Sequence, residues 1–167
     1  LGVARQILAH TFGIDAEQVR ILSPYIGGGF GGKMLGPEAI CAAIAARAIG
    51  RPVRIAMTRQ QLFHNVYRRT ETHQRIRLAA DADGKLTALA HDSVVAQGPH
   101  GGFMEPVALG TLSLYSAPVR QITHRVVTMD MITAGAVRAP GEAVGMMALE
   151  SAVDEMAHQL GMDPIAF

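Results

Sequence analysis

The chain has 167 residues, 49% of them hydrophobic and 17% charged, and its formal net charge is +1 at pH 7. This composition argues against intrinsic disorder, which needs few apolar and many charged residues, and the single cysteine, Cys41, excludes a disulfide-stapled scaffold. Lys and Arg never cluster beyond the adjacent pair Arg68 and Arg69, so we expect no nucleic-acid partner, and no apolar stretch is long enough for a membrane span.

The first half of the chain predicts helices and short apolar strands. An amphipathic pattern begins at once and ends at Gly13, and a proline–glutamate pair opens a second helix that stops at Gly50. This second helix is apolar nearly all round, so we expect it to be buried, with Cys41 as a packing residue. The predicted helices cover residues 2–12, 37–49 and 59–65, the last capped by Thr58. The predicted strands cover residues 19–22 and 53–57.

The second half predicts a β-hairpin, a further strand and a long amphipathic helix. Asp83 and Gly84 form a strong hairpin turn signal between two strand-like runs. The predicted strands cover residues 72–80, 85–97 and 121–131, with a loop over 98–102 and an unassigned segment over 103–119. The helix covers 142–160 and ends before Gly161, with a stripe of Met146, Leu149, Val153, Met156 and Leu160. These elements predict an α+β fold with a mixed sheet, packed helices and an antiparallel hairpin.

Both ends of the chain look interrupted. The amphipathic pattern starts at Leu1 without a preceding capping residue, and Asp163-Pro164 has the form of a helix start although the chain stops at Phe167. We therefore expect residues 1–167 to be one partial domain that is truncated at both ends.

The glycine run over residues 27–33, GGGFGGK, is a candidate binding loop with competing interpretations. The spacing matches the dinucleotide fingerprint G-x-G-x-x-G, but the next helix begins late, and arginines occupy the region where an acidic residue should meet the ribose. An arginine suits NADP, so this interpretation stays open. Gly27, Gly32 and Lys33 also match the ATP phosphate loop, but Met34 replaces the Ser or Thr that binds magnesium.

A third interpretation of the same run is a backbone cradle for another anionic ligand. Successive N–H groups that no side chain shields form a concavity suited to an anion. The structural alternative is a flexible turn, although a turn with so many glycines is entropically expensive to order.

A second candidate loop, Arg138-Ala139-Pro140-Gly141-Glu142, lies at the start of the last predicted helix. A helix N-terminus offers free N–H groups and partial positive charge, and Arg138 adds a cation, so the segment suits an anion. An ordinary helix entry with a surface arginine explains the same residues.

Taken in order, these motifs resemble the molybdenum-cofactor-binding subunit of the xanthine dehydrogenase/aldehyde oxidase family. The resemblance covers essentially the whole chain and is strongest for the bacterial aldehyde oxidoreductases of that family, whose cofactor is usually molybdopterin cytosine dinucleotide. It implies a molybdopterin-binding-domain-like fold. The segments that carry it are residues 27–33, 50–54, 138–150, 153–155 and 160–164.

The resemblance implies roles for both loops. Backbone groups of the first loop, and the arginine before the last helix, would lie near the metal, which here means Phe30 and Arg138. The cofactor-binding residues implied in this way are Gly28, Gly29, Phe30, Gly31, Gly32, Arg138, Ala139 and Gly141. The cofactor is electron-rich, so backbone N–H donors suit it without any bond from protein to metal.

Three departures from the purine-oxidising members bear on the substrate. Met34 stands where those members have a glutamate, Pro106 aligns with an arginine, and Pro140 replaces a phenylalanine that stacks on the substrate. All three changes remove purine-specific groups, so the resemblance implies an aldehyde or N-heterocycle instead. The second loop also lacks the cysteine of carbon monoxide-oxidising members.

The resemblance further implies hydroxylation of an electrophilic carbon with water as the oxygen source. Electrons would leave through iron–sulfur clusters and FAD in partner subunits or domains of the same enzyme. The family's general base is a glutamate beyond the position of Phe167, so we assign no catalytic residue, neither Glu105 nor Glu142. The isolated chain is expected to be inactive, and its location stays open between bacterial cytoplasm and periplasm. The scattered histidines predict no zinc site.

Overall fold

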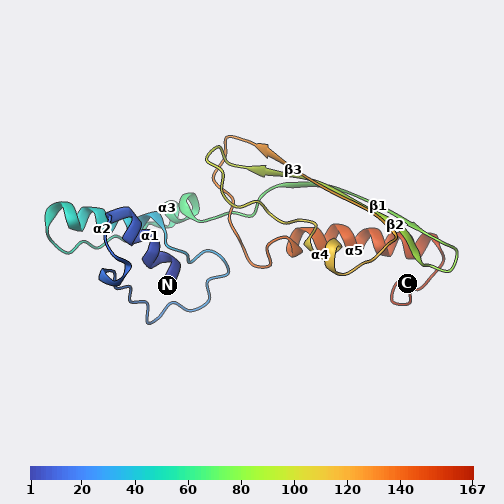
Figure 1. The fold of residues 1–167 in the computed structure, drawn as a ribbon, viewed down its shortest axis with the longest axis horizontal. Helices are drawn as coiled ribbons and strands as arrows, with labels where there is room; N and C mark the ends of the chain where they lie inside the picture. Colours follow the sequence, from blue (N-terminus) through green and yellow to red (C-terminus); the bar gives the residue numbers. More distant parts are fainter. The chain divides into compact units, whose positions relative to one another are not determined.

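A computed structural model describes residues 1–167, which form two compact units, residues Leu1–Val66 (unit 1) and Tyr67–Phe167 (unit 2). Figure 1 labels the α-helices and the strands, which are numbered in chain order. Unit 1 contains α1 (Gly2–Phe12), η1 (Ala16–Gln18), α2 (Pro37–Ile49) and α3 (Arg59–Asn65). Unit 2 contains β1 (Thr72–Ala80), β2 (Leu86–Gln97), α4 (Leu109–Ser113), β3 (Val119–Thr128) and α5 (Glu142–Gln159).

Local signals set the helix ends of unit 1 where the sequence predicts them. Gly13 and Gly50 follow α1 and α2 in the left-handed conformation, with φ of 63° and 64°, which glycine adopts without a steric penalty. Thr58 accepts a hydrogen bond from the Gln61 backbone N–H at 3.2 Å, in a capping box that starts α3. The helices predicted over 2–12, 37–49 and 59–65 are confirmed.

Two expectations for unit 1 are wrong. Residues 19–22 and 53–57 are extended but form no strand, because a strand needs a hydrogen-bonded neighbour and no other segment pairs with them. The helix α2 is not buried, since none of its residues is fully buried and Cys41 is exposed. The Arg47 side chain of α2 contacts the end of α1. Its guanidinium donates to the Phe12 carbonyl at 3.0 Å and lies over the Phe12 ring.

Unit 2 is built on a three-stranded mixed sheet in the order β1-β2-β3, so the α+β expectation is confirmed. The hairpin β1–β2 is antiparallel, with His91 opposite Ile76, and β3 pairs parallel to β2, with His91 opposite Ile122. The turn forms where the sequence predicts it, since Asp81 accepts hydrogen bonds from the backbone of Asp83 and Lys85. The segment predicted as a strand over 121–131 lies two to three residues earlier, at Val119–Thr128.

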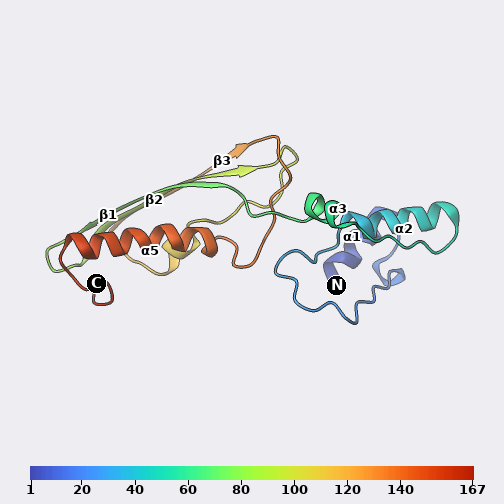
Figure 2. The same ribbon diagram turned by 180° about the vertical axis from the view of Figure 1, so that it is seen from behind.

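The helix α5 covers one face of the sheet, and α4 lies beside it on the same side (Figures 1 and 2). The core between sheet and helix is formed by Leu89, Leu149 and Val153, two of which belong to the predicted stripe of α5. Gly145 and Ala157 are also buried on α5, and at Gly145 the helix approaches the backbone of Val107 closely. The remaining stripe residues that pack here, such as Met146, are only partly buried.

A buried histidine ties the sheet to both helices of unit 2. His91 contacts the Thr111 hydroxyl of α4 through Nδ1 at 2.7 Å and the Gln74 amide oxygen through Nε2 at 3.2 Å. Gln74 in turn donates to the carbonyl of Val144 in the first turn of α5 at 3.2 Å. Burial lowers the pKa of His91, with Asp92 opposing that shift, so the neutral ring is favoured in this network.

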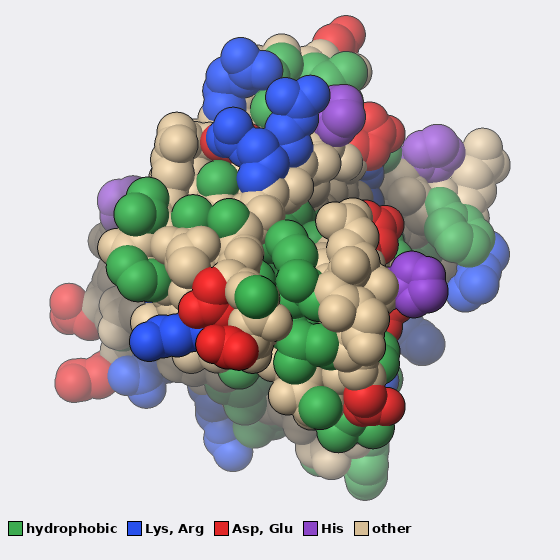
Figure 3. All heavy atoms as spheres, turned by 90° about the vertical axis from the view of Figure 1, so that its right-hand side faces the viewer, with side chains coloured by type: hydrophobic (Ala, Val, Ile, Leu, Met, Phe, Trp, Pro, Cys, Tyr) green, Lys and Arg blue, Asp and Glu red, His purple; other side chains and the backbone are tan.

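The surface of the chain is partly apolar. Figure 3 shows hydrophobic side chains exposed among charged ones on one face of the molecule. None of the helices combines the length and the apolar composition that crossing a bilayer would require.

Near the end of the chain, Asp163 caps a turn and not a helix, since its carboxylate accepts from the backbone N–H groups of Ile165 and Ala166.

Candidate functional site

The first candidate loop, residues 27–33 of unit 1, has a strained backbone. Gly27, Phe30 and Gly31 have φ of 58°, 50° and 96°. Two hydrogen bonds hold the loop: Gly32 N–H donates to the Gly29 carbonyl at 2.8 Å, and Lys33 Nζ donates to the Ile26 carbonyl at 2.6 Å. The left-handed region costs little for glycine but is unusual for a bulky residue such as Phe30.

The side chains of this loop lie at its surface. Phe30 is 67% exposed, and Met34, one of the predicted substrate residues, is 62% exposed. A Cβ added at Gly28 would come within 2.9 Å of the Phe30 ring, so the ring lies directly against the backbone of Gly28. The loop therefore presents backbone groups beside one aromatic ring.

The structure lacks the context that either nucleotide motif needs. A dinucleotide fingerprint or a phosphate loop connects a strand to a helix that starts within or directly after the motif. No strand precedes the run 27–33, and α2 begins only at Pro37. The strand expected at 19–22, which either motif would need before the run, is absent.

The second candidate loop, residues 138–141 of unit 2, lies at the start of α5. Ala139 has φ of 54° and Gly141 has φ of 85°. The helix begins at once, because Ala143 N–H donates to the Ala139 carbonyl at 3.0 Å and Gly145 N–H donates to the Gly141 carbonyl at 2.8 Å. Arg138 and Ala139 are exposed and Gly141 is buried, so the outer side of the loop is open to a ligand.

A buried carboxylate holds the inner side of the second loop. Glu105 has no exposed surface, and its Oε1 accepts hydrogen bonds from Gly141 N–H at 2.6 Å and from Arg69 Nη1 at 2.9 Å. Arg69 also donates to the backbone carbonyls of Arg138 and Ala139. Oε2 of Glu105 is buried and has no hydrogen-bond partner in the structure.

The segment after Glu105 packs directly against the loop. A Cβ at Gly141 would lie 2.3 Å from the Pro106 carbonyl oxygen, and a Cβ at Gly145 would lie 1.8 Å from the Val107 carbonyl oxygen. The structure therefore brings Pro106, one of the predicted substrate residues, next to Gly141 and thus to Pro140, another of them. The sequence alone does not point to Arg69 or give Glu105 a role, because both contact the loop through its backbone: Arg69 donates to carbonyls, and Glu105 accepts from the Gly141 N–H.

The two loops share one backbone property. Phe30 and Ala139 are the two non-glycine residues of the chain with positive φ, and each lies in one of the loops predicted to bind the cofactor. Strained backbone of this kind clusters at ligand sites, where the surrounding structure holds it in place.

Other polar groups lie apart from the loops. On the sheet, Asp92 accepts from the Thr123 hydroxyl at 2.6 Å and from Arg77 at 2.7 Å, and both interactions hold the pKa of Asp92 below its usual value. Burial lowers the pKa of His124.

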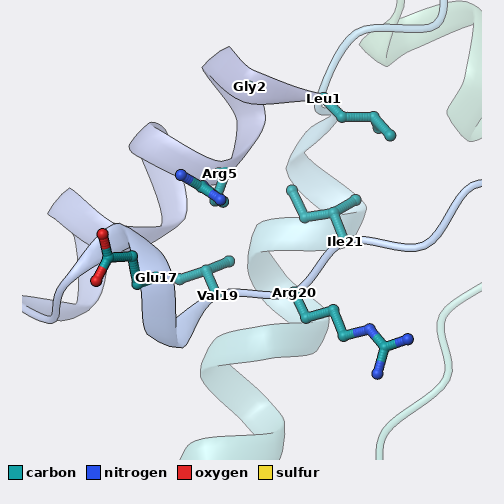
Figure 4. Close-up of a pocket in the computed structure, with 7 residues that line it drawn as sticks. All are labelled: Leu1, Gly2, Arg5, Glu17, Val19, Arg20 and Ile21. Atoms are coloured by element: carbon teal, nitrogen blue, oxygen red, sulfur yellow. The ribbon is translucent and has the colours of Figure 1, made fainter.

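An open pocket in unit 1 is lined by α1 and the segment after it and contains none of the predicted site residues (Figure 4). No group of three or more His, Cys, Asp or Glu side chains is placed to hold a metal ion.

Comparison with known proteins gives consistent matches. The molybdopterin cofactor-binding domain family matches residues 2–167. The aldehyde oxidoreductase molybdenum-binding subunit PaoC of Escherichia coli K12 is 45% identical over 164 residues, which are 98% of this chain and 22% of that protein. The aldehyde oxidoreductase of Megalodesulfovibrio gigas is 29% identical, over 95% of this chain and 18% of that protein.

The comparison with solved structures finds proteins of the same kind. Quinoline 2-oxidoreductase from Pseudomonas putida 86 matches with a TM-score of 0.89 and 30% identity, over 98% of this chain and 22% of that one. The aldehyde oxidoreductase from Desulfovibrio gigas matches with a TM-score of 0.83 and 30% identity, over 96% of this chain and 18% of that one. The chain thus spans about a fifth of the length of the proteins it matches.

Proposed function

Because the chain belongs to the molybdopterin cofactor-binding domain family, within the xanthine dehydrogenase/aldehyde oxidase family, we propose that it binds the molybdenum cofactor of an oxidoreductase. The cofactor form is molybdopterin cytosine dinucleotide. Its contacts are backbone groups of residues 27–33 and of the helix start 138–142. The enzyme oxidises an aldehyde or an N-heterocycle with water as the oxygen source.

The observation that carries the proposal is the placement of strained backbone. Phe30 and Ala139 adopt positive φ in the two segments that the family resemblance assigns to the cofactor. A left-handed Phe or Ala costs of order 1 kcal/mol or more, and such residues cluster at ligand sites, where the surrounding structure holds them in place. Neither residue needs this conformation to continue a helix or a strand.

The residues of both loops fit the chemistry of such a cofactor. Phosphate and other electron-rich groups take N–H donors, and the glycines of the first loop leave backbone N–H groups without flanking side chains. In the second loop, a Cβ at Gly141 would collide with Pro106, so the close approach of backbone there depends on glycine. A cofactor that brings its own sulfur ligands needs no cluster of His, Cys or carboxylates from the chain.

In this function the chain binds the cofactor and orients it. When bound, the cofactor supplies the two-electron oxidation of the substrate carbon. The Gly29–Gly31 segment and the Arg138–Ala139 segment present N–H groups to it. The start of α5 adds partial positive charge, which stabilises negative charge nearby. The Phe30 ring is exposed within the first loop, next to those N–H groups.

The proposed substrate class is supported by three uncharged, apolar residues. Met34, Pro106 and Pro140 carry no charge and no side-chain hydrogen-bond donor, so they suit a substrate without the polar edges of a purine. The relatives named as aldehyde oxidoreductases favour an aldehyde, and the quinoline 2-oxidoreductase favours an N-heterocycle. Iron–sulfur and FAD partners of the same enzyme receive the electrons.

The test is molybdenum content in the full-length gene product that carries this sequence. We expect about one molybdenum per chain in the wild type, measured by metal analysis, together with aldehyde-dependent reduction of a dye. Gly31→Ala, at φ of 96°, should lower the molybdenum content at least about tenfold, because alanine disfavours the left-handed loop.

The matched control is Gly50→Ala. Gly50 also has positive φ, lies in the same unit and has open space around it, so the substitution causes similar backbone strain outside the loop. It should leave molybdenum content unchanged. Absence of molybdenum from the wild type, or equal loss in both variants, contradicts the proposal. Micromolar binding of NADP or ATP by calorimetry, abolished by Gly29→Val, would favour a nucleotide-binding domain instead.

A further inference from the structure

We propose that Glu105 and Arg69 are positioning residues that fix the second loop and thereby set the direction of its Ala139 N–H. All the residues involved belong to unit 2, and their contacts are present without any ligand. The effect of these contacts on the cofactor rests on the proposed function.

Glu105 holds the end of the loop that joins α5. Its Oε1 accepts from Gly141 N–H at 2.6 Å, in a position with no solvent access. Hydrogen bonds to a charged acceptor are stronger than neutral ones, and a carboxylate at a helix N-terminus is also stabilised by the helix dipole. A single buried oxygen therefore pins both the loop and the first turn of the helix.

Arg69 holds the other end of the loop. Its guanidinium donates to Glu105 Oε1 at 2.9 Å, and to the carbonyls of Arg138 and Ala139. The planar guanidinium presents several donors in a fixed arrangement, so it can hold two successive carbonyls at once. Lysine, with one compact ammonium, cannot reproduce this pattern.

These contacts determine where the loop points its own donor. A trans peptide is planar, and its C=O and N–H point in opposite directions. Since the Arg138 carbonyl faces Arg69, the N–H of Ala139 faces away from Arg69, toward the outer side of the loop. The next residue, Pro140, has no N–H, so Ala139 supplies the donor at this point.

The strained conformation of Ala139 is consistent with a loop that Arg69 and Glu105 hold in place. An alanine at φ of 54° relaxes unless its neighbours hold it, and here both adjacent carbonyls contact Arg69. Without the Glu105 carboxylate, Arg69 would lose its acidic partner and Gly141 N–H its acceptor. The loop would then relax and the Ala139 N–H would turn.

Two variants test the proposal with one matched control. Arg69→Lys keeps the charge but loses the double contact, and Glu105→Gln keeps the size but loses the charge. Arg77→Lys alters the exposed ion pair with Asp92 on the sheet of the same unit. If Glu105→Gln fails to fold, judged by amide protection in β1 and β2, Arg69→Lys carries the test.

The first measurement is hydrogen exchange of the backbone amides of residues 1–167 in the full-length gene product. We expect the amides of Gly141 and Ala143 to exchange at least about tenfold faster in both variants, with β1 and β2 unchanged. Arg77→Lys should match the wild type. Unchanged exchange at Gly141 in both variants overturns the proposal, whether or not the protein holds molybdenum.

The second measurement uses the full-length gene product. The electron paramagnetic resonance spectrum of molybdenum should shift in both variants while the metal content stays within about twofold of the wild type. Faster exchange with an unaltered spectrum at full metal content overturns the link to the cofactor. A wild type without molybdenum refutes the proposed function instead, and the exchange result then still decides the positioning role.

Discussion

Substitution of Gly145 by alanine tests the backbone packing that holds α5 in place. A Cβ at this position would lie 1.8 Å from the Val107 carbonyl oxygen, whereas real Cβ atoms almost never approach within 3.0 Å. The two backbones would have to separate by more than about 1 Å. Both Gly145 and Val107 are buried, and neither contact atom is the flexible end of a side chain, so the strain falls on the main chain.

The magnitude follows from two opposing effects. Overpacking of a well-packed site costs about 1–3 kcal/mol, and a rigid backbone clash belongs at the upper end of that range. Alanine gains about 1 kcal/mol over glycine in helix propensity. We therefore expect Gly145→Ala to lower the free energy of unfolding by about 2 kcal/mol, which is about 8 °C in Tm for a unit of this size.

The assay is thermal and urea unfolding of the purified chain, followed by circular dichroism. Ser151→Ala is the control, since it raises helix propensity on the exposed face of the same helix and should stay within about 0.5 kcal/mol of the wild type. A Gly145→Ala variant as stable as the wild type, or more stable, would refute the close approach of α5 to residue 107.

Two further expectations concern the core of unit 2. Leu149→Ala, at a fully buried position, should cost about 2–5 kcal/mol in urea unfolding, whereas Met147→Ala on the exposed face should cost little. The pKa of His91 is lowered by burial, so the unfolded chain binds its proton more readily. Stability should fall as the pH drops below the ordinary value of 6.5 and level off below the folded-state pKa; a nuclear magnetic resonance titration with His91 protonating above 6.5 would contradict this.

Local signals made most helices and the hairpin predictable. Gly13 and Gly50 mark helix ends in the left-handed conformation, and the Asp81 carboxylate organises the hairpin turn by accepting hydrogen bonds from the backbone N–H groups of Asp83 and Lys85. Each of these features depends on neighbours within a few residues, which a sequence displays directly. The parallel pairing of β3 with β2 was not predictable, because nothing local in either strand specifies its partner.

The two failed strand predictions share one physical reason. Residues 19–22 and 53–57 have strand composition, but a strand exists only where another segment supplies hydrogen bonds. In the candidate site, the glycine run and Arg138 stood out by composition. The Arg69–Glu105 pair did not stand out, since its members are 36 residues apart in the sequence. Both residues also contact backbone atoms, which every residue type has, so the sequence of the loop does not indicate these contacts.

The mixed pairing of the sheet also sets an order of assembly. The hairpin β1–β2 closes through a short turn and can form within microseconds, whereas β3 must first cross a connection of some 20 residues that contains α4. During synthesis, the ribosome releases β1 and β2 before β3, and all three before α5. The apolar side of the nascent hairpin, which includes Leu89, therefore stays exposed until α5 is synthesised and buries it, and a chaperone that binds this face would protect the chain from aggregation in that interval.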